Sequence, residues 1–177
     1  MPDVADRKNP GTQYEATTTG ALRLVLRQMK VTPADWTFVD IGSGKGKVLF
    51  HAAGYGFQEV IGVEHSETLA TIADCNLARF TATNTSKSPI QCVHGDALRY
   101  QLPAVPLVIW LYNPFGAELI GQFVERLEAH RAATGAAIRV AYSNPLHAEC
   151  FDRSEHFHRM VEVETILQGN CLIFRTD

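Results

Sequence analysis

A loop rich in glycine holds the residue types of this sequence that are best suited to binding a ligand. Residues 40–47 read Asp-Ile-Gly-Ser-Gly-Lys-Gly-Lys, so Gly42, Gly44 and Gly46 alternate with other residues. Alternate glycines let the backbone turn tightly and approach a ligand that a Cβ atom would exclude. A helix that starts after the loop would direct free N–H groups and the positive end of its dipole at that ligand. We therefore expect a binding site here.

Two carboxylates accompany the loop. Asp40 directly precedes the glycines, and Glu64 ends the next apolar run, eighteen residues after Gly46. A carboxylate at the second position can accept both hydroxyls of a ribose, as in dinucleotide-binding folds. A carboxylate at the first position suits a cationic amino group, because charge-assisted hydrogen bonds to an ammonium are strong.

Three ligand classes compete for this loop. Nicotinamide dinucleotides use the spacing GxGxxG, which the GxGxG spacing here fits poorly. A phosphate loop needs GxxxxGK[ST], but Ile41 stands at its first glycine and Val48 at its hydroxyl position. S-adenosylmethionine (SAM) has no pyrophosphate and needs a glycine turn with carboxylates for a ribose and an ammonium. The residues present fit SAM best.

A second segment, Asn113-Pro114-Phe115, follows the most apolar run of the chain. Methyl transfer is an in-line displacement, so the nucleophile must aim a lone pair at the methyl carbon. The side-chain oxygen of Asn113, or the carbonyl of Asn113 or Pro114, can accept the N–H bonds of an amine and orient it. Phe115 can stack on the acceptor or offer its π-face to a cation.

A structural alternative exists for this segment, since Asn-Pro before a helix is also ordinary N-cap and N1 chemistry. The dipeptide recurs as Asn144-Pro145, again before an expected helix. At least one of the two pairs is then expected to serve in part as a cap. His147 follows the second pair and is a candidate general base.

Short apolar runs alternate with amphipathic segments and predict the elements that position these residues. Strands are expected over 37–41, 59–63, 90–93, 105–112 and 136–142, with a terminal hairpin formed by 156–167 and 170–174. Helices are expected over 21–29, 45–54, 66–80, 117–133 and 146–151. The pattern predicts an α/β fold: three layers, doubly wound, around a mostly parallel seven-stranded sheet with a C-terminal antiparallel hairpin. Ligands of such sheets bind outside the C-terminal ends of the strands.

Composition restricts the remaining classes. The chain has 177 residues, 46% of them hydrophobic and 20% charged, which fits one packed domain. A net charge of −3 argues against dependence on nucleic acid. The polar start and the lack of a long apolar run predict a cytoplasmic protein without membrane contact. The four cysteines and seven histidines show no metal-binding pattern, so we expect reduced thiols in the core and no metal site.

The segment Phe38–Gly46 resembles the first motif of class I, Rossmann-like SAM-dependent methyltransferases, and Glu64 resembles their ribose-binding acid. The resemblance implies SAM as cofactor. It implies a cofactor site formed by Asp40, Gly42, Ser43, Gly44, Gly46, Glu64, Asp96 and Ala97, with His65 at its border and Asn113 reaching it. In it Asp96 would accept from the adenine amine. Asn113-Pro114-Phe115 is similar to the Asn/Asp-Pro-Pro-Tyr/Phe motif of amino-directed methyltransferases, with one proline missing.

The segment Tyr14-Glu15-Ala16-Thr17 is similar to a Tyr-x-Pro/Ala-Thr segment of the non-SET histone-lysine methyltransferases and related protein-lysine methyltransferases. In those enzymes it closes over the methionine end of the cofactor, so the resemblance implies that Tyr14 and Thr17 contact SAM. The alternative is that Thr17 is only a helix N-cap. We accordingly divide the chain into an N-terminal arm and helix over 1–30, acting as a lid, and a SAM-binding core over 31–177.

Transfer of a methyl group to nitrogen, in a protein lysine or another amine, is the expected activity, with an RNA base as a further acceptor. Asn113, Pro114 and Phe115 would orient that acceptor. Two other functions stay open: a SAM-binding module or partner subunit without turnover, and a nicotinamide-dependent oxidoreductase, which the glycine spacing disfavours. The residues indicate no oligomeric state.

Overall fold

The structure is a computed structural model that describes residues 19–165 and 169–176. Its first half contains α1 (Thr19–Gln28), η2 (Pro33–Asp35), β1 (Thr37–Ile41), α2 (Lys47–Ala52), η3 (Ala53–Tyr55), β2 (Glu59–Glu64), α3 (Glu67–Thr83) and β3 (Ile90–His94). The second half contains β4 (Leu107–Tyr112), α4 (Ala117–Thr134), β5 (Ile138–Ser143), α5 (Glu149–Asp152), β6 (Phe157–Thr165) and β7 (Gly169–Thr176).

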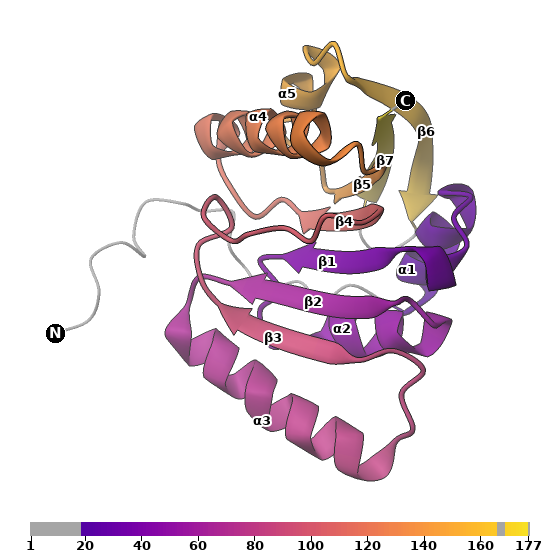
Figure 1. Ribbon diagram of the computed structural model, residues 1–177, viewed down its shortest axis with the longest axis vertical. Coiled ribbons are helices and arrows are strands. Elements are labelled where there is room, and N and C mark those ends of the chain that lie inside the picture. The colour runs from indigo at the N-terminus through magenta and orange to yellow at the C-terminus, as the bar shows by residue number, and fades with distance from the viewer. Residues whose placement is uncertain (1–18, 166–168, 177) are drawn as a thin grey trace, which may run out of the picture.

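One seven-stranded sheet forms the centre of the molecule, in the order β3-β2-β1-β4-β5-β7-β6 (Figure 1). The pairs among β1 to β5 are parallel, and β7 lies antiparallel between β5 and β6. The arrowheads of β1, β2 and β3 point to the same edge of the sheet in Figure 1. The order reverses between β1 and β4, which makes the ends of these two strands the switch point where such sheets bind ligands. The predicted fold class is confirmed.

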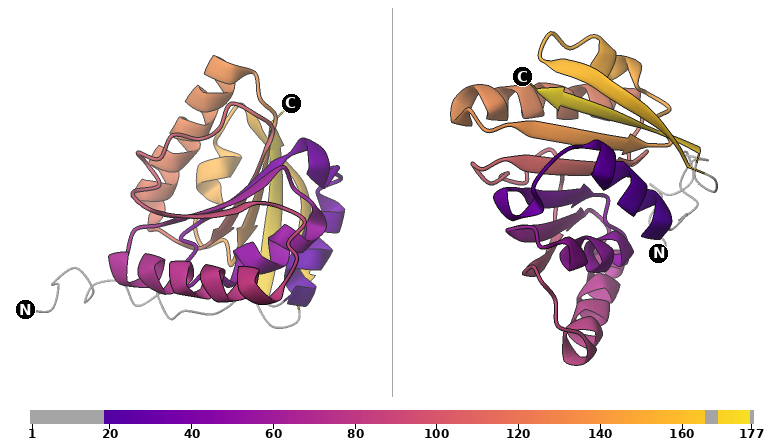
Figure 2. Two further views of the ribbon diagram at one scale, coloured as in Figure 1. Left: turned by 60° about the horizontal axis from the view of Figure 1, so that its bottom comes forward. Right: turned by 90° about the vertical axis from the view of Figure 1, so that its right-hand side faces the viewer.

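Helices cover both faces of the sheet, as the left panel of Figure 2 shows for α1 and α4. On one face α1 and α2 bury side chains such as Leu22, Met29 and Leu49 against Phe38 and Trp110. The other face packs α4 and α5 onto a second core. Because β1 and β4 are covered on both sides, neither shows an alternating pattern: β4 is a continuous apolar run, and β1 departs from one only at Thr37 and Asp40.

The connection from β3 to β4 holds no helix, and none is expected from the sequence between residues 93 and 105. It closes a turn in which the N–H groups of Arg99 and Tyr100 donate to the carbonyl of Asp96, and Pro103 and Pro106 prevent a helix from continuing. Two local features, α5 and the cysteines, differ from the sequence-based expectation. The helix expected over 146–151 shortens to α5. Among the cysteines, only Cys171 is buried, whereas Cys75 is exposed.

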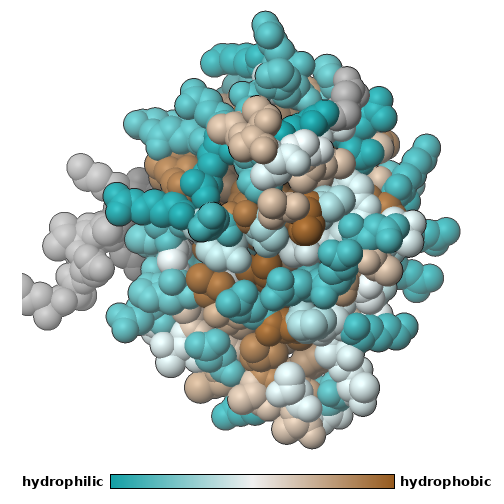
Figure 3. Space-filling model, in the orientation of Figure 1, coloured by the Kyte–Doolittle hydropathy of each residue, from teal (hydrophilic) through white to brown (hydrophobic). Residues whose placement is uncertain are grey.

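The surface carries no broad apolar band on the face seen in Figure 3, where brown side chains form small islands among teal ones. Among the residues that the structure describes, no helix is long and apolar enough to cross a membrane.

Candidate active site

The loop after β1 turns on glycines in the left-handed region. Gly42, Gly44 and Gly46 have φ angles of 76°, 56° and 82°, which residues with a Cβ rarely adopt. Gly42 is exposed, and a Cβ placed on it would lie 3.1 Å from the Cβ of Pro114. The loop after β1 therefore touches the loop after β4, and the backbone of Gly42 faces open space beside that contact.

Glu64 at the end of β2 holds the loop in place. Its Oε2 accepts a hydrogen bond from the N–H of Gly44 at 2.8 Å, and its Oε1 accepts one from Ser66 at 2.8 Å. Each carboxylate oxygen can accept a further bond, so Glu64 retains capacity for the two hydroxyls of a ribose. The same side chain can shape the loop and bind the ligand.

Asp40 lies at the floor of the site, with 3% of its surface exposed, between the neighbouring strand positions Gly62 and Trp110. Burial, and to a smaller extent the negative charge of Glu64, raise the pKa of Asp40 from 3.8 to about 8. A bound cation would favour the ionised form and offset this cost. A buried carboxyl of this kind is suited to the ammonium of an amino-acid moiety.

Gly62 is a site residue that the sequence analysis missed. A Cβ on Gly62 would lie 2.5 Å from Cδ1 of Leu49 and 2.7 Å from Oγ of Ser43. Ser43 is buried, and its side chain packs against β2 beneath the loop. The β2 register places Gly62 beside Asp40, so a glycine two residues before the acid was the available signal.

The segment after β3 forms a turn at the rim. Oδ1 of Asp96 accepts from the N–H of Leu98 at 2.8 Å, and Oδ2 lies 3.7 Å from Nε of Arg99. Ala97 is buried in the core on the α4 face. Nε2 of His94 lies 3.1 Å from the carbonyl oxygen of His65, which joins the ends of β2 and β3. Asp96 and His65 are exposed, at the same edge of the sheet as Glu64.

Asn113 adopts a left-handed conformation, with φ of 39°, directly before Pro114. The N-cap of α4 is Gly116, so Asn113 does not cap this helix. Its Oδ1 instead accepts a hydrogen bond from the hydroxyl of Tyr142 at 3.2 Å. Phe115 is half-buried and meets the ring of Phe123 edge-on at 6.4 Å, so its ring packs partly against α4.

The loop after β5 repeats this geometry. Asn144 has φ of 48°, and its N–H donates to the carbonyl of Asn170 on β7. The N-cap of α5 is Ala148, so the expectation that an Asn-Pro pair serves as a cap is wrong at both positions. Nδ1 of His147 lies 3.8 Å from Oε1 of Glu149. Sequence reasoning did not single out Glu149 or Tyr142, because each looks like an ordinary surface or core residue.

Tyr14 and Thr17 lie outside the residues that the structure describes, as does all of the predicted lid over 1–30 that precedes α1. Among the described residues, no group of histidine, cysteine, aspartate and glutamate side chains could hold a metal ion.

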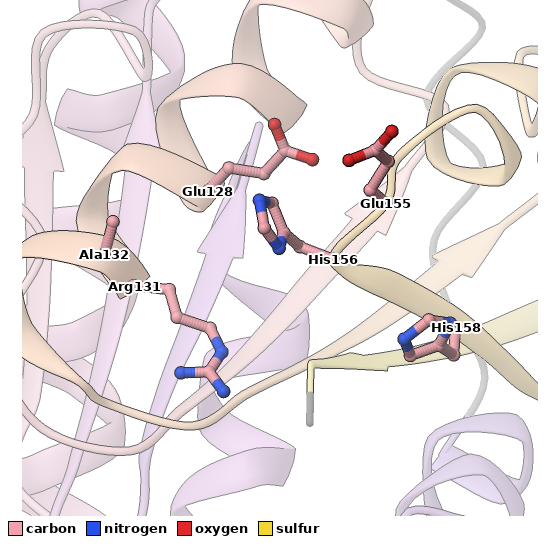
Figure 4. A pocket seen from close by; sticks show the side chains of 6 residues that line it. All are labelled: Glu128, Arg131, Ala132, Glu155, His156 and His158. Atoms are coloured by element: carbon pink, nitrogen blue, oxygen red, sulfur yellow. The ribbon is translucent and has the colours of Figure 1, made fainter.

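A hollow of about 290 Å³ lies away from this site (Figure 4). It is lined by Glu128, Arg131, Ala132, Glu155, His156 and His158. These residues belong to the last turns of α4, to the segment that leads into β6 and to the start of β6. Phe157 at the start of β6 pairs with Thr176 at the end of β7, and Arg175 of β7 pairs with Arg139 near the start of β5. The start of β6 therefore lies at the end of the sheet opposite to the glycine loop. The hollow is therefore separate from the candidate active site.

Comparisons with known proteins agree with this fold. Residues 10–86, somewhat under half of the chain, match the family model of the histone methylation protein DOT1. This match spans the glycine loop and Glu64. No curated protein sequence matches the chain.

Solved structures match over most of the chain. A SAM-dependent methyltransferase from Aquifex aeolicus superposes with a TM-score of 0.64 at 14% identity, over 88% of this chain and 89% of that chain. An RNA methyltransferase from Salinibacter ruber, in complex with S-adenosyl-L-homocysteine, gives 0.59 at 14% identity over 92% of each chain. The magnesium protoporphyrin IX methyltransferase of Synechocystis, with bound SAM, gives 0.62 at 11% identity over 90% of this chain and 79% of that one.

The chain has the fold of the class I SAM-dependent methyltransferases. This fold and the match to the DOT1 model together indicate a SAM-dependent methyltransferase, and the ligands of the matched structures support SAM as its cofactor.

Proposed function

We propose that the protein transfers the methyl group of SAM to a nitrogen acceptor, in a protein lysine or another amine. The observation that carries this proposal is the contact between Gly42 and Pro114. It brings the loop suited to the cofactor against the loop that begins with Asn113. An acceptor held by the second loop would lie next to a ligand held by the first.

The residues of the cofactor side fit SAM. The buried carboxyl of Asp40 is suited to the ammonium, and Glu64 to the ribose hydroxyls. The exposed backbone of Gly42 leaves room for the methionine moiety. Asp96 and His65 would border the adenine. SAM supplies a methyl group on a sulfonium, which leaves without protonation.

On the acceptor side, the chain's contribution is orientation. The side-chain oxygen of Asn113, or the main-chain carbonyl of Asn113 or Pro114, would accept the N–H bonds of a neutral amine and turn its lone pair toward the methyl carbon. His147, held near Glu149, is the base candidate of this side of the site. Phe115 would flank the acceptor.

Charge favours an amine over a nucleic acid. The net charge of −3 disfavours phosphate binding, and Glu118 and Glu149, both exposed, lie in the segments after β4 and β5. Acidic groups there would attract a cationic amine. The matched structures act on different acceptors according to their titles, which name RNA and magnesium protoporphyrin IX. The acceptor of this chain must therefore be found by experiment.

The test incubates the protein with methyl-labelled SAM and with extract separated into protein, RNA and small-molecule fractions. We expect label in protein or small amines, in a form that resists alkaline hydrolysis as N-methyl groups do. Label in RNA would overturn the proposed protein or amine acceptor, and label released by base as methanol would overturn nitrogen as the acceptor atom. Glu64→Ala is the control, since it removes the ribose-binding group and should abolish transfer.

The same assay separates the competing functions. Binding of SAM by calorimetry without label in any fraction would favour a module without turnover. An increase in NADH fluorescence on mixing would instead indicate an oxidoreductase.

A further inference from the structure

Tyr142 on β5 is a buried polar group to which the proposed function assigns no role. Its side chain is fully buried and packs with Phe151 at a ring-centroid distance of 6.0 Å. Its hydroxyl lies between the loop after β4 and the loop after β5. Buried hydroxyls are almost always hydrogen-bonded, and their partners define what they hold in place.

The partners of this hydroxyl fix its direction. The backbone N–H of His147 interacts with the phenolic oxygen and lowers the pKa of Tyr142, and a backbone N–H cannot accept a hydrogen bond in return. The hydroxyl proton is therefore available for the other partner, Oδ1 of Asn113, at 3.2 Å. Burial raises the pKa of Tyr142 to about 12, so the group keeps this proton throughout the physiological range.

This arrangement decides which way the Asn113 amide faces. Its oxygen points at Tyr142 and its NH₂ group points away, an orientation that the amide alone would not fix. Asn113 also has φ of 39°, in the left-handed region, although residues directly before a proline prefer an extended backbone. A residue in such a conformation persists when its surroundings hold it there.

We propose that Tyr142 is a positioning residue that orients the Asn113 amide and joins the two Asn-Pro loops through Asn113 and His147. Tyr142 is fully buried and acts on the acceptor only through Asn113. The part of the proposal that concerns methyl transfer rests on the proposed function. The orientation of Asn113 does not, and it can be measured without turnover.

The first experiment measures that orientation by NMR of the full chain. Tyr142→Phe removes only the hydroxyl and keeps the ring against Phe151. We expect the His147 amide to exchange with solvent about tenfold faster and the two Nδ2 proton signals of Asn113 to shift. The control is Tyr55→Phe, since Tyr55 is half-buried against the other face of the sheet. Unchanged His147 and Asn113 signals in Tyr142→Phe would overturn the proposal.

The second experiment measures methyl transfer with the acceptor fraction identified by labelling. We expect Tyr142→Phe to lower kcat about tenfold while the KM for SAM changes less than twofold. In an Asn113→Ala background, Tyr142→Phe should cause no further loss, because the two residues act as one unit. An equal loss in both backgrounds would show that Tyr142 acts independently of Asn113. If the protein transfers no methyl group, the NMR experiment alone tests whether Tyr142 orients the Asn113 amide.

Discussion

Asp40 illustrates how a single residue exchanges stability for binding. In the folded protein its pKa is raised from 3.8 to about 8 by burial and by Glu64. Between these two values the folded state holds a proton that the unfolded state releases. The stability of the folded state therefore falls as pH rises from about 4 to about 8. A cationic ligand reverses this penalty, because it favours the ionised carboxylate.

Replacement of Asp40 with asparagine should remove the penalty. We expect Asp40→Asn to be more stable than the natural protein at pH 8 without ligand, by on the order of 2–5 kcal/mol, and the gain to vanish toward pH 4. Its affinity for SAM should fall at the same time. Thermal unfolding at pH 5 and pH 8, with and without SAM, measures both effects. A variant less stable than the natural protein at pH 8 would contradict this account.

Glu64 holds the glycine loop and, in the proposed function, also binds the ribose, so its loss should weaken both the fold and SAM binding. Glu64→Ala leaves the buried N–H of Gly44 without its partner and removes the acceptor for the ribose. We expect SAM affinity by calorimetry to fall about 100-fold or more, since each hydrogen bond to a charged group contributes ~1.5–3 kcal/mol. Glu59→Ala, at the opposite end of β2, is the matched control. Equal affinities of the two variants would rule out the ribose assignment.

At the scale of elements, the contact between β2 and the loop after β1 leaves less space for an added side-chain atom at Gly62 than there is at Gly42 or Gly121. Gly62→Ala would place a Cβ within 2.7 Å of two side chains, one of them the buried Leu49. We expect a loss of about 1–3 kcal/mol of stability and weaker SAM binding, because Ser43 and its loop must shift.

A second glycine-to-alanine substitution, in α4, should change the stability of the protein in the opposite direction. A Cβ on Gly121, within α4, meets no atom within 4 Å. Gly121→Ala should therefore stabilise the protein by about 0.5–1 kcal/mol through the helix preference of alanine, without effect on SAM binding. Denaturant unfolding compares the two variants. If Gly62→Ala and Gly121→Ala lost similar amounts of stability, the close contact of Gly62 with Leu49 and Ser43 would not explain the loss.

The sequence predicted the elements well where one signal dominated. β4 is an unbroken apolar run, and Ser66 precedes α3 and accepts from the N–H of Leu69 as a cap should. No helix was predicted for the connection before β4, and none is present there. Tyr142 and Gly62, by contrast, were missed. On a strand they resemble ordinary core positions, and only the register of neighbouring strands shows what they touch.

At the scale of the whole molecule, the sheet and its covering helices use most of the described residues. Under the proposed function, the loops after β4 and β5 are the segments of that part of the chain that would recognise the acceptor. Both begin with Asn-Pro, and Tyr142 connects them. The chain can thus change its acceptor by changing two short loops, while the cofactor side stays constant.

Ligand binding should be visible in the stability of the entire domain. A ligand present at 100 times its dissociation constant stabilises the folded state by about 2.7 kcal/mol, which in a domain of this size is about 5–10 °C in Tm. We expect SAM to produce such a shift and NADH to produce none. The same scan on Glu64→Ala should show a much smaller response to SAM. A shift with NADH alone would exclude the SAM assignment.

Trp110 lies beside Asp40 on the neighbouring strand, and its buried indole N–H has no hydrogen-bond partner among the described residues. An indole in this position experiences the local electric field of the carboxyl group directly, without screening by solvent. Ionisation of Asp40, or arrival of an ammonium, changes that field and with it the emission energy of the ring. The other tryptophan, Trp36, faces the guanidinium of Arg139 at 5.6 Å and lies at the opposite end of β1. The protein therefore contains an intrinsic optical probe of the charge in its own cofactor site.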